Sequence, residues 1–218
     1  MRILRAGQDQ AGRTAVTIGV YDGVHRGHRW LLRKLRHAGQ SAGLQTALVT
    51  FDPHPLRVLR PVAAPRMLAD LDQRLCLLSG TGCVDVCVVL DFDTDRSEQQ
   101  AEDFVEDVLV GQVHAAEIVV GAGFRFGHDR AGDIDLLSRL GEKFAFSVTS
   151  IPLLPVGPES AARPCSSTLI RSLVSKGDVE SAARLLCRPH EVSGTVAGTS
   201  WPRPGRGVPN VVVRVEPD

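Results

Sequence analysis

The sequence predicts an α/β fold with a mostly parallel sheet flanked by helices. Short apolar runs typical of buried strands alternate along the chain with segments of helical periodicity. Glycines and prolines mark the boundaries between these segments. Because strands separated by helices pair in parallel through crossover connections, the alternation itself indicates the architecture. Ligands in such folds bind beyond the carboxyl ends of the strands, so the residues that follow each strand are the first candidates for a site.

Five strands are expected, each from a run of apolar and β-branched residues. The first, AVTIGV, is followed by glycines and then by Leu31, Leu35 and Ala38 at helical spacing. Ser97 and Gln100 have the spacing of a capping box ahead of a further helix. The strands are expected within residues 15–20, 45–51, 84–92, 116–124 and 144–151, and the later helices over 68–78, 101–110, 133–140, 167–176 and 179–186.

The composition is that of an ordinary globular protein, either one domain or one domain with an appendage. Of 218 residues, 43% are hydrophobic, and 25 Lys and Arg balance 25 Asp and Glu. A formal charge of zero gives no electrostatic footprint for nucleic acid or an anionic membrane. No apolar run is long enough for a membrane span or a secretory signal, so a cytoplasmic location is expected. The five cysteines form no CxxC pair and are expected to be buried free thiols, with Cys83 and Cys87 in the core.

The chain changes character after Leu186. Residues 188–218 are rich in glycine, proline and β-branched residues and show no helical period. A segment of about thirty residues cannot bury a core of its own. We therefore expect a main domain over residues 1–187 and a short β-rich appendage over 188–218.

The stretch GVYDGVHRGH, residues 19–28, follows the first strand and opens a helix. Gly23 and Gly27 permit a tight turn and a close approach of the backbone to a ligand. A helix that begins near His25 offers free N–H groups and a positive dipole end, which suit a phosphate. His25 and His28 share one face of its first turn, where imidazoles can donate hydrogen bonds to oxygens that gain charge in phosphoryl or nucleotidyl transfer. The residues alone leave two alternatives open: ordinary surface histidines and, less favoured, part of a zinc site.

Four ordered motifs resemble those of one known family. GVYDGVHRGH is similar to the GxFDGxHxGH signature of the bacterial FAD synthetases, which are HxGH nucleotidylyltransferases. TFDPHP (residues 50–55), VVGAGFRFGHDRAGD (119–133) and SSTLIR (166–171) resemble the family's second, third and fourth motifs, and AARLLCRPHEVSGTV resembles the junction to the riboflavin kinase module of bifunctional members. The resemblance implies a Rossmann-like nucleotidylyltransferase fold and transfer of AMP from ATP to FMN. Mg²⁺ is implied by the triphosphate, and the sequence contains no dedicated carboxylate cage for it.

The resemblance also implies roles for residues at the matching positions. The catalytic residues would be His25, His28 and Arg171. Several residues at the matching positions also have a plainer explanation from the sequence alone. SSTLIR can be a helix N-cap, Asp22 and Asp52 can be turn residues, and Phe124 and Phe126 can be core packing. The nucleotide is expected to contact Gly19, Tyr21, Asp22, Gly23, Gly27, Ser166, Ser167 and Thr168, and the flavin Asp52, Pro53, His54, Gly123, Phe124, Arg125 and Phe126.

Three departures from the family pattern bear on activity. Gly123 stands where the family usually has Asp or Asn, and Leu169 where the fourth motif usually has arginine. GRGVPNVVV, residues 205–213, is a decayed form of the kinase segment GR-x-x-G-x-PTAN. Residues 188–218 are therefore expected to be a truncated remnant of the kinase module, without riboflavin kinase activity.

The leading interpretation is an FMN adenylyltransferase that acts on small molecules. One alternative is the same chemistry with CTP as donor, or with a modified flavin or another phosphorylated acceptor. A second is a catalytically weak flavin- or nucleotide-binding protein. The sequence indicates neither nucleic acid nor membrane as a partner, and it carries no signal for an oligomeric state.

Overall fold

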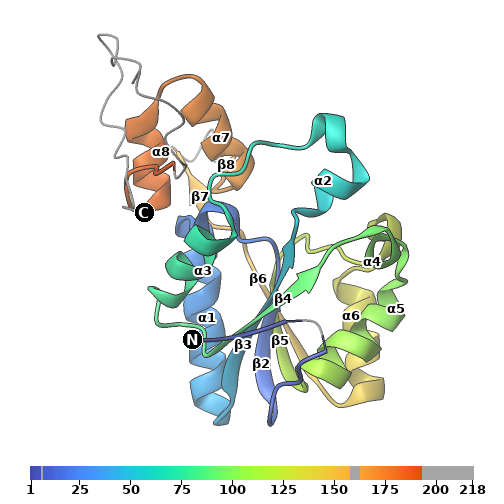
Figure 1. The fold of residues 1–218 in the computed structure, drawn as a ribbon. Helices are drawn as coiled ribbons and strands as arrows, with labels where there is room; N and C mark the ends of the chain where they lie inside the picture. The colour runs from blue at the N-terminus through green and yellow to red at the C-terminus, as the bar shows by residue number, and fades with distance from the viewer. Residues whose placement is uncertain (6, 158–162, 193–218) are drawn as a thin grey trace, which may run out of the picture.

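A six-stranded parallel sheet organises the part of the chain that the structure describes. The structure is a computed structural model that describes residues 1–5, 7–157 and 163–192. The strand order is β1-β4-β3-β2-β5-β6, and all five pairings between neighbours are parallel (Figure 1). The strands are β1 (Arg2–Leu4), β2 (Thr14–Ile18), β3 (Gln45–Asp52), β4 (Val86–Asp91), β5 (Ala115–Gly121) and β6 (Ser147–Ile151).

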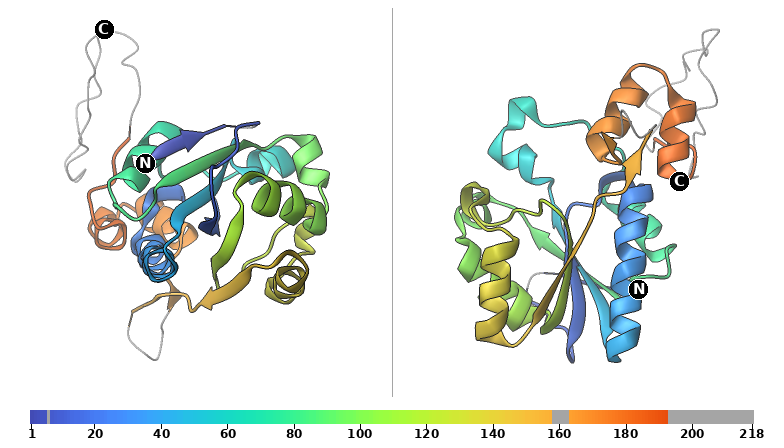
Figure 2. Two further views of the ribbon diagram at one scale, coloured as in Figure 1. Left: turned by 90° about the horizontal axis from the view of Figure 1, so that it is seen from below. Right: turned by 180° about the vertical axis from the view of Figure 1, so that it is seen from behind.

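Helices cover both faces of the sheet, which explains why its central strands are apolar almost throughout. Every residue of β2 is buried, and β4 is buried up to its last residue. Leu32 and Leu35 of α1 and Leu78 of α3 belong to the buried cluster on one face, and Leu109 and Leu137 to the cluster on the other (Figure 2). The helices on the two faces are α1 (Arg26–Ala42), α3 (Leu71–Ser79), α5 (Ala101–Phe104) with its π-helical continuation η3 (Val105–Gln112), and α6 (Ile134–Phe144).

The remaining elements lie toward the carboxyl ends of the strands (Figure 1). The last two helices and Leu68, which precedes α3, form a small separate core there, built from Leu68, Ile170, Ala182 and Leu186. This core places α7 and α8 above the edge of the sheet where parallel α/β folds bind ligands. These elements are α2 (Pro55–Leu59), α4 (Thr94–Glu98), the antiparallel pair β7 (Pro155–Val156) and β8 (Arg163–Pro164), α7 (Ser167–Ser175) and α8 (Val179–Leu186), with the short turns η1 (Asp22–Val24), η2 (Pro61–Ala63) and η4 (His128–Arg130).

The predicted α/β architecture and its five strands are confirmed, with ends that differ by a few residues. The strand β1 carries too few residues to show a pattern, and the sequence does not predict it. The predicted capping box is wrong. Ser97 lies inside α4, where its hydroxyl donates to the Thr94 carbonyl at 2.7 Å, and Gln100 precedes α5 without a side-chain cap bond. The spacing indicated that a single helix begins after Ser97, whereas the structure has two short helices there, α4 and α5.

The prediction of five buried thiols is only partly right. Cys87 and Cys165 are buried and Cys83 is partly buried, with Cys83 and Cys87 packed in one core cluster as expected. Cys76 and Cys187 are exposed, because they lie on the outer face of α3 and at the end of α8.

The predicted appendage falls mostly outside the described residues. Of residues 188–218, the structure describes 188–192, which form neither helix nor strand. Within the described ranges, no helix is both long and apolar enough to cross a membrane.

Candidate active site

A buried turn connects β2 to α1 and carries the first residues of the site. Tyr21, Gly23 and Val24 all have positive φ values, of 56°, 77° and 41°. Tyr21 is buried, and its hydroxyl shares a 2.7 Å hydrogen bond with Thr17. Burial raises the pKa of the Tyr21 phenol, so the group stays protonated. Tyr21 therefore anchors the turn from within the core, and its ring lies 4.8 Å from that of His28.

The two histidines stack on each other at the start of α1. Their ring centroids are 3.6 Å apart at an interplanar angle of 17°. His25 is the N-cap, and its Nδ1 accepts a hydrogen bond from the His28 backbone N–H at 3.3 Å. A neutral imidazole that accepts at Nδ1 carries its proton on Nε2, so His25 presents a donor away from the helix.

Burial keeps both imidazoles neutral. It lowers the pKa of His25 to about 4, with Arg171 also lowering it and Asp22 opposing the shift. Burial and the neighbouring His25 hold the pKa of His28 well below its usual range. The Nδ1 atom of His28 is buried and has no hydrogen-bond partner among the described residues.

Asp22 joins the turn to two other parts of the chain. Its carboxylate is 2% exposed and accepts hydrogen bonds from the backbone N–H groups of Leu68 and Ala69 at 3.0 to 3.1 Å. It also forms a 2.7 Å ion pair with Arg171 of α7. These bonds connect the turn to the segment before α3 and to α7. They agree with the plainer explanation of Asp22 as a turn residue.

The fourth motif packs against this turn from the other side. Ser166 is the N-cap of α7 and accepts from the Leu169 backbone N–H, while the Ser167 hydroxyl donates to the Asp22 carbonyl at 2.9 Å. Thr168 is exposed at the start of the helix. Just before the helix, Cys165 Sγ lies 3.7 Å from His25 Nδ1.

Two glycines of the first motif lie where a side chain would not fit easily. A Cβ at Gly27 would lie 3.1 Å from the Cys165 carbonyl and 3.2 Å from the His25 ring. A Cβ at Gly23 would meet Leu68 and Leu186 at 3.0 to 3.1 Å, at a φ value that favours glycine. The first and fourth motifs are therefore packed directly against each other. Gly19, at the start of the first motif, is partly exposed beside the Tyr21 ring.

The second motif lies beside the same cluster of charges. A cis peptide bond joins Asp52 to Pro53, which is exposed, and His54 caps α2 by accepting from the Leu56 backbone N–H at 3.0 Å. Burial, followed by the positive charge of Arg171, lowers the pKa of His54.

A buried arginine of α3 backs this second motif. Arg74 is 1% exposed, donates to the Phe51 carbonyl at 3.0 Å and lies 3.8 Å from an Asp52 carboxylate oxygen. Burial lowers the pKa of Arg74, and the charges of Asp52 and Asp22 oppose that shift.

The third motif forms a more open loop after β5. Gly123 is exposed at φ 83°, and an added Cβ there would have no atom within 4 Å. Phe126 is buried in the core and Phe124, which is partly buried, stacks on it at 5.4 Å. Arg125 is exposed and pairs with Asp133 at 3.1 Å. Core packing therefore accounts for Phe126, whereas Gly123, Phe124 and Arg125 have surface available to a ligand.

Five buried side-chain nitrogens in the described part of the chain have no hydrogen-bond partner, and all five belong to residues around the first motif. Such atoms are rare in folded proteins, and each costs about 1–3 kcal/mol. His28 stacks on His25, Arg171 pairs with Asp22, and the other three residues interact electrostatically with Asp22. This concentration indicates a polar, anionic ligand. The atoms are His28 Nδ1, Arg74 Nε, Arg171 Nε, Arg188 Nε and His190 Nε2.

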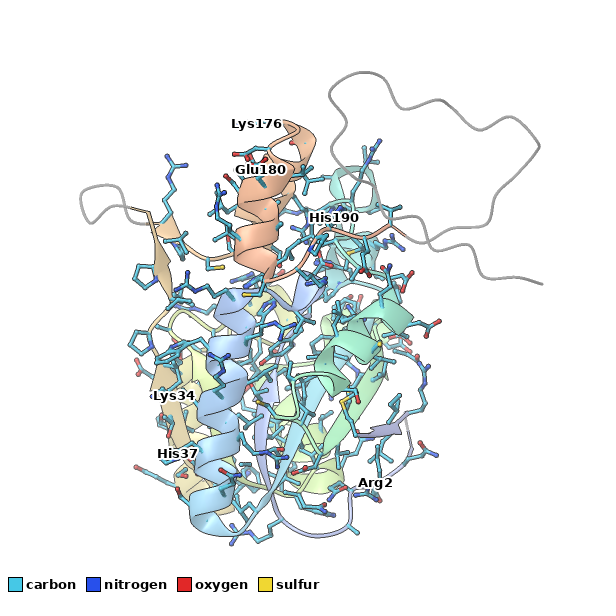
Figure 3. The ribbon with its side chains drawn as sticks, turned by 90° about the vertical axis from the view of Figure 1, so that its left-hand side faces the viewer. Arg2, Lys34, His37, Lys176, Glu180 and His190 are labelled. Carbon is cyan, nitrogen blue, oxygen red and sulfur yellow. The ribbon has the colours of Figure 1, made fainter. Side chains whose placement is uncertain are left out.

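Sequence reasoning missed three of these five residues. Arg74 occupies a buried position of α3 together with Leu75 and Leu78, and a cation in an apolar helical stripe is a signal that the sequence contains. Arg188 and His190 fall in the predicted appendage, within the segment that resembles the junction to the riboflavin kinase module, a resemblance that implies no role for either residue in this site. In Figure 3, α8 stands above the first turn of α1, and the segment after it carries His190 over the same end of the sheet.

Comparison with known proteins agrees with the motifs. The chain matches the FAD synthetase family over residues 7–168. It is 35% identical over 181 residues to the bifunctional riboflavin kinase/FMN adenylyltransferase of Escherichia coli K12, a match that covers 83% of this chain and 56% of the relative. A protein of the same description from Buchnera aphidicola subsp. Schizaphis graminum is 33% identical over 84% of this chain and 57% of its own. The chain thus spans a little over half the length of these curated relatives.

A solved structure supports the fold. The crystal structure described as a macrolide-efflux protein from Streptococcus pneumoniae superposes with a TM-score of 0.72 at 25% identity, over 87% of this chain and 63% of that one. The resemblance found in the sequence is confirmed: this chain belongs to the FAD synthetase family.

Proposed function

We propose that the protein is an FMN adenylyltransferase, which transfers AMP from ATP to FMN and releases pyrophosphate. The observation that carries the proposal is the group of five unpartnered buried nitrogens around His25 and His28. A triphosphate brings many acceptor oxygens and several negative charges, and so matches what this cluster lacks. Family membership supports the same activity.

The proposed reaction is a displacement at the α-phosphorus of ATP. A phosphate oxygen of FMN forms the new bond to that phosphorus, the bond to the bridging oxygen of the β-phosphate breaks, and pyrophosphate leaves. Charge develops on the transferred group and on the leaving group. Fixed hydrogen-bond donors aimed at those oxygens lower the barrier, because they need no reorganisation during the reaction.

The histidines act as neutral donors in this proposal. His25 presents its Nε2–H, because its Nδ1 already accepts from the His28 backbone. A low pKa keeps the imidazoles neutral, so they bind the phosphates through hydrogen bonds without trapping the product by charge. The charge of Arg171, only one-fifth exposed, and the start of α7 would hold the leaving pyrophosphate.

Mg²⁺ would enter as part of the substrate MgATP. In the described residues, no group of three or more His, Cys, Asp or Glu side chains is placed to hold a metal ion. Asp22, the carboxylate closest in sequence to the histidines, is occupied by Arg171 and by two backbone N–H groups. The donor set therefore fits an ion that keeps mainly phosphate oxygens and water as ligands.

FMN would bind on the side of the second and third motifs. Asp52, His54, Phe124 and Arg125 offer a partly exposed surface of aromatic and charged groups. The open space at Gly123 also favours, as a second candidate, an acceptor that differs from FMN.

The test is product analysis with the purified protein. It is incubated with MgATP and FMN, and mass spectrometry and a pyrophosphate assay follow FAD and pyrophosphate in equal amounts. Parallel arms with CTP and GTP, and with riboflavin phosphate analogues, identify a different donor or acceptor. A folded protein that forms no dinucleotide in any arm contradicts the proposed function and leaves a binding protein.

The remaining expectations belong to the same proposal. Residues 1–187 would form the nucleotidyl-transfer unit, and the substrates would be small molecules rather than nucleic acid or membrane. A cytoplasmic location and the absence of riboflavin kinase activity remain predictions.

A further inference from the structure

The turn before His25 has an unfavourable backbone conformation. Positive φ values occur at Tyr21, Gly23 and Val24, and a β-branched residue such as Val24 rarely adopts one. Strain of this kind persists where surrounding contacts over-determine the conformation, and it gathers at functional sites. The contacts that hold this turn therefore also determine the direction in which His25 and His28 point.

Three successive carbonyl groups of the turn accept hydrogen bonds from three different side chains. The Asp22 carbonyl accepts from Ser167 Oγ at 2.9 Å, and the Val24 carbonyl accepts from Arg29 Nε at 3.3 Å. Between them, the Gly23 carbonyl accepts from Arg188 Nη1 at 2.8 Å, across 165 residues of sequence. Two of the three donors thus come from α7 and from the segment that follows α8.

The proposed reaction makes use of the unpartnered Nε of Arg188, but it does not explain the bond from Arg188 Nη1 to the turn. Its side chain is partly buried, and no carboxylate of the described residues lies within ion-pair distance of it. Among the described residues its Nε has no hydrogen-bond partner, and the like charge of Arg29 acts on it more strongly than the charge of either Glu191 or Asp22. A partly buried cation without an ion-paired acid is unfavourable for stability. Its bond to a carbonyl of a strained turn therefore indicates a role in the site.

We propose that Arg188 is a positioning residue, which holds the Gly23 carbonyl and thereby fixes the turn that aims His25 and His28 at the reacting phosphate. The kinetic part of this inference rests on the proposed function. The catalytic unit then extends beyond the predicted boundary at residue 187, into the segment expected to be a remnant of another module.

The experiment compares Arg188→Ala and Arg188→Lys with Arg184→Ala. Arg184 is an exposed arginine of α8 whose guanidinium, among the described residues, donates to Ser181 of the same helix, so it controls for loss of surface charge. We expect kcat to fall about 10- to 100-fold in Arg188→Ala with little change in the KM for MgATP, because a small misplacement of reacting groups has effects of this size. Guanidinium ions added to Arg188→Ala, or the lysine in Arg188→Lys, should restore part of the rate. A merely structural role would not respond to guanidinium in a protein that is already folded.

A second readout does not depend on turnover. In spectra of protein labelled with ¹³C at histidine Cε1, the resonances of His25 and His28, assigned from single variants, should shift in Arg188→Ala and stay in place in Arg184→Ala. Unchanged resonances overturn the inference, as does a higher KM with unchanged kcat, which would make Arg188 a ligand contact. If the wild type forms no dinucleotide at all, the proposed function fails, and the resonances alone still decide whether Arg188 positions the histidines.

Discussion

The first and third motifs both follow a strand at the same edge of the sheet, yet they are built in opposite ways. The turn over Tyr21–His25 is buried and strained, and side chains from α1, α7 and the segment after α8 bond to its carbonyl groups. In the loop after β5, Gly123 is exposed, and a Cβ added to it would have no atom of the described residues within 4 Å. The conformation of the turn is fixed by many contacts, whereas the loop after β5 is open to solvent.

The difference matches two different requirements of group transfer. Donors at the reacting phosphate must be fixed before the reaction, because reorganisation would cost rate. The acceptor's flat ring system needs apolar contact and a few polar groups, and an open loop can meet that need with several ligands. We therefore expect changes in the first region to have large effects on rate and stability, and changes in the second to have small effects on binding.

The largest effect is expected for His28→Ala. Removing one fixed donor at the phosphates typically lowers kcat by about 100-fold or more, whereas FMN affinity should hardly change. The loss of stability should be limited to the ring contacts with His25 and Tyr21, because the His28 Nδ1 has no hydrogen-bond partner among the described residues to lose. Steady-state kinetics, FMN titration and thermal unfolding test this, with His37→Ala, on the exposed part of α1, as the control. Normal turnover in His28→Ala would place the reacting phosphate elsewhere.

The next effect is on stability, for Asp22→Asn. The asparagine loses the charge that balances Arg171, and it puts an NH₂ group in place of the oxygen that accepts from Arg171 and from the Leu68 backbone N–H. Because Asp22 is almost fully buried, we expect a loss of about 2–3 kcal/mol in the free energy of unfolding, measured with urea.

The matched control for Asp22→Asn lies in the open region. Asp133→Asn also separates an aspartate from an arginine, but both groups of that pair are substantially exposed. Its effect should be much smaller, because solvent screens an exposed pair. Equal losses in the two variants would remove the contrast between the regions.

The buried His25 also predicts a dependence of stability on pH. Its pKa is lowered to about 4 in the folded protein, mainly by burial, from an ordinary value of 6.5. Between these two values the unfolded chain binds a proton that the folded chain does not. Stability is therefore fully present above pH 6.5 and falls as the pH drops toward 4, with His25 contributing a slope of about 1.4 kcal/mol per pH unit.

The variant His25→Asn isolates this contribution, because asparagine keeps an acceptor for the His28 backbone N–H. Urea unfolding at several values between pH 7 and pH 4.5 should show a shallower decline for the variant than for the wild type. Parallel curves would mean that His25 is not buried as a neutral group.

The sequence predicts the loop after β5 and the two histidines of the site. It does not predict the contacts that hold those histidines in place. Apolar runs and the glycines after them predict the strands and the edge where the motifs meet, because burial and turn geometry are local in sequence. Donors such as Arg188 act across more than a hundred residues and lie outside the four motifs. The stacking of His25 on His28 and the shared acceptor Asp22 likewise depend on packing between α1, α3 and α7, which no local pattern specifies.

The smallest effect is expected at Gly123, and it concerns binding. The family usually has Asp or Asn at this position, and Gly123→Asn would restore a polar contact worth about 1 kcal/mol, or a several-fold gain in FMN affinity. The structure adds two constraints: an added Cβ would have no atom of the described residues within 4 Å, but the φ value of 83° strains any residue with a Cβ. Asparagine tolerates such values better than alanine does.

Gly123→Ala and Gly43→Asn separate these contributions. Gly43 also has a positive φ, of 66°, and open space, but it ends α1 at the far end of that helix from the histidines. We expect Gly123→Ala to lose about 1 kcal/mol of stability without gaining affinity, and Gly43→Asn to leave FMN binding unchanged. A gain in FMN affinity that is confined to Gly123→Asn would indicate that the loop after β5 binds FMN as the acceptor. Weaker FMN binding in that variant, at preserved stability, would instead mean that the glycine leaves room for a different acceptor.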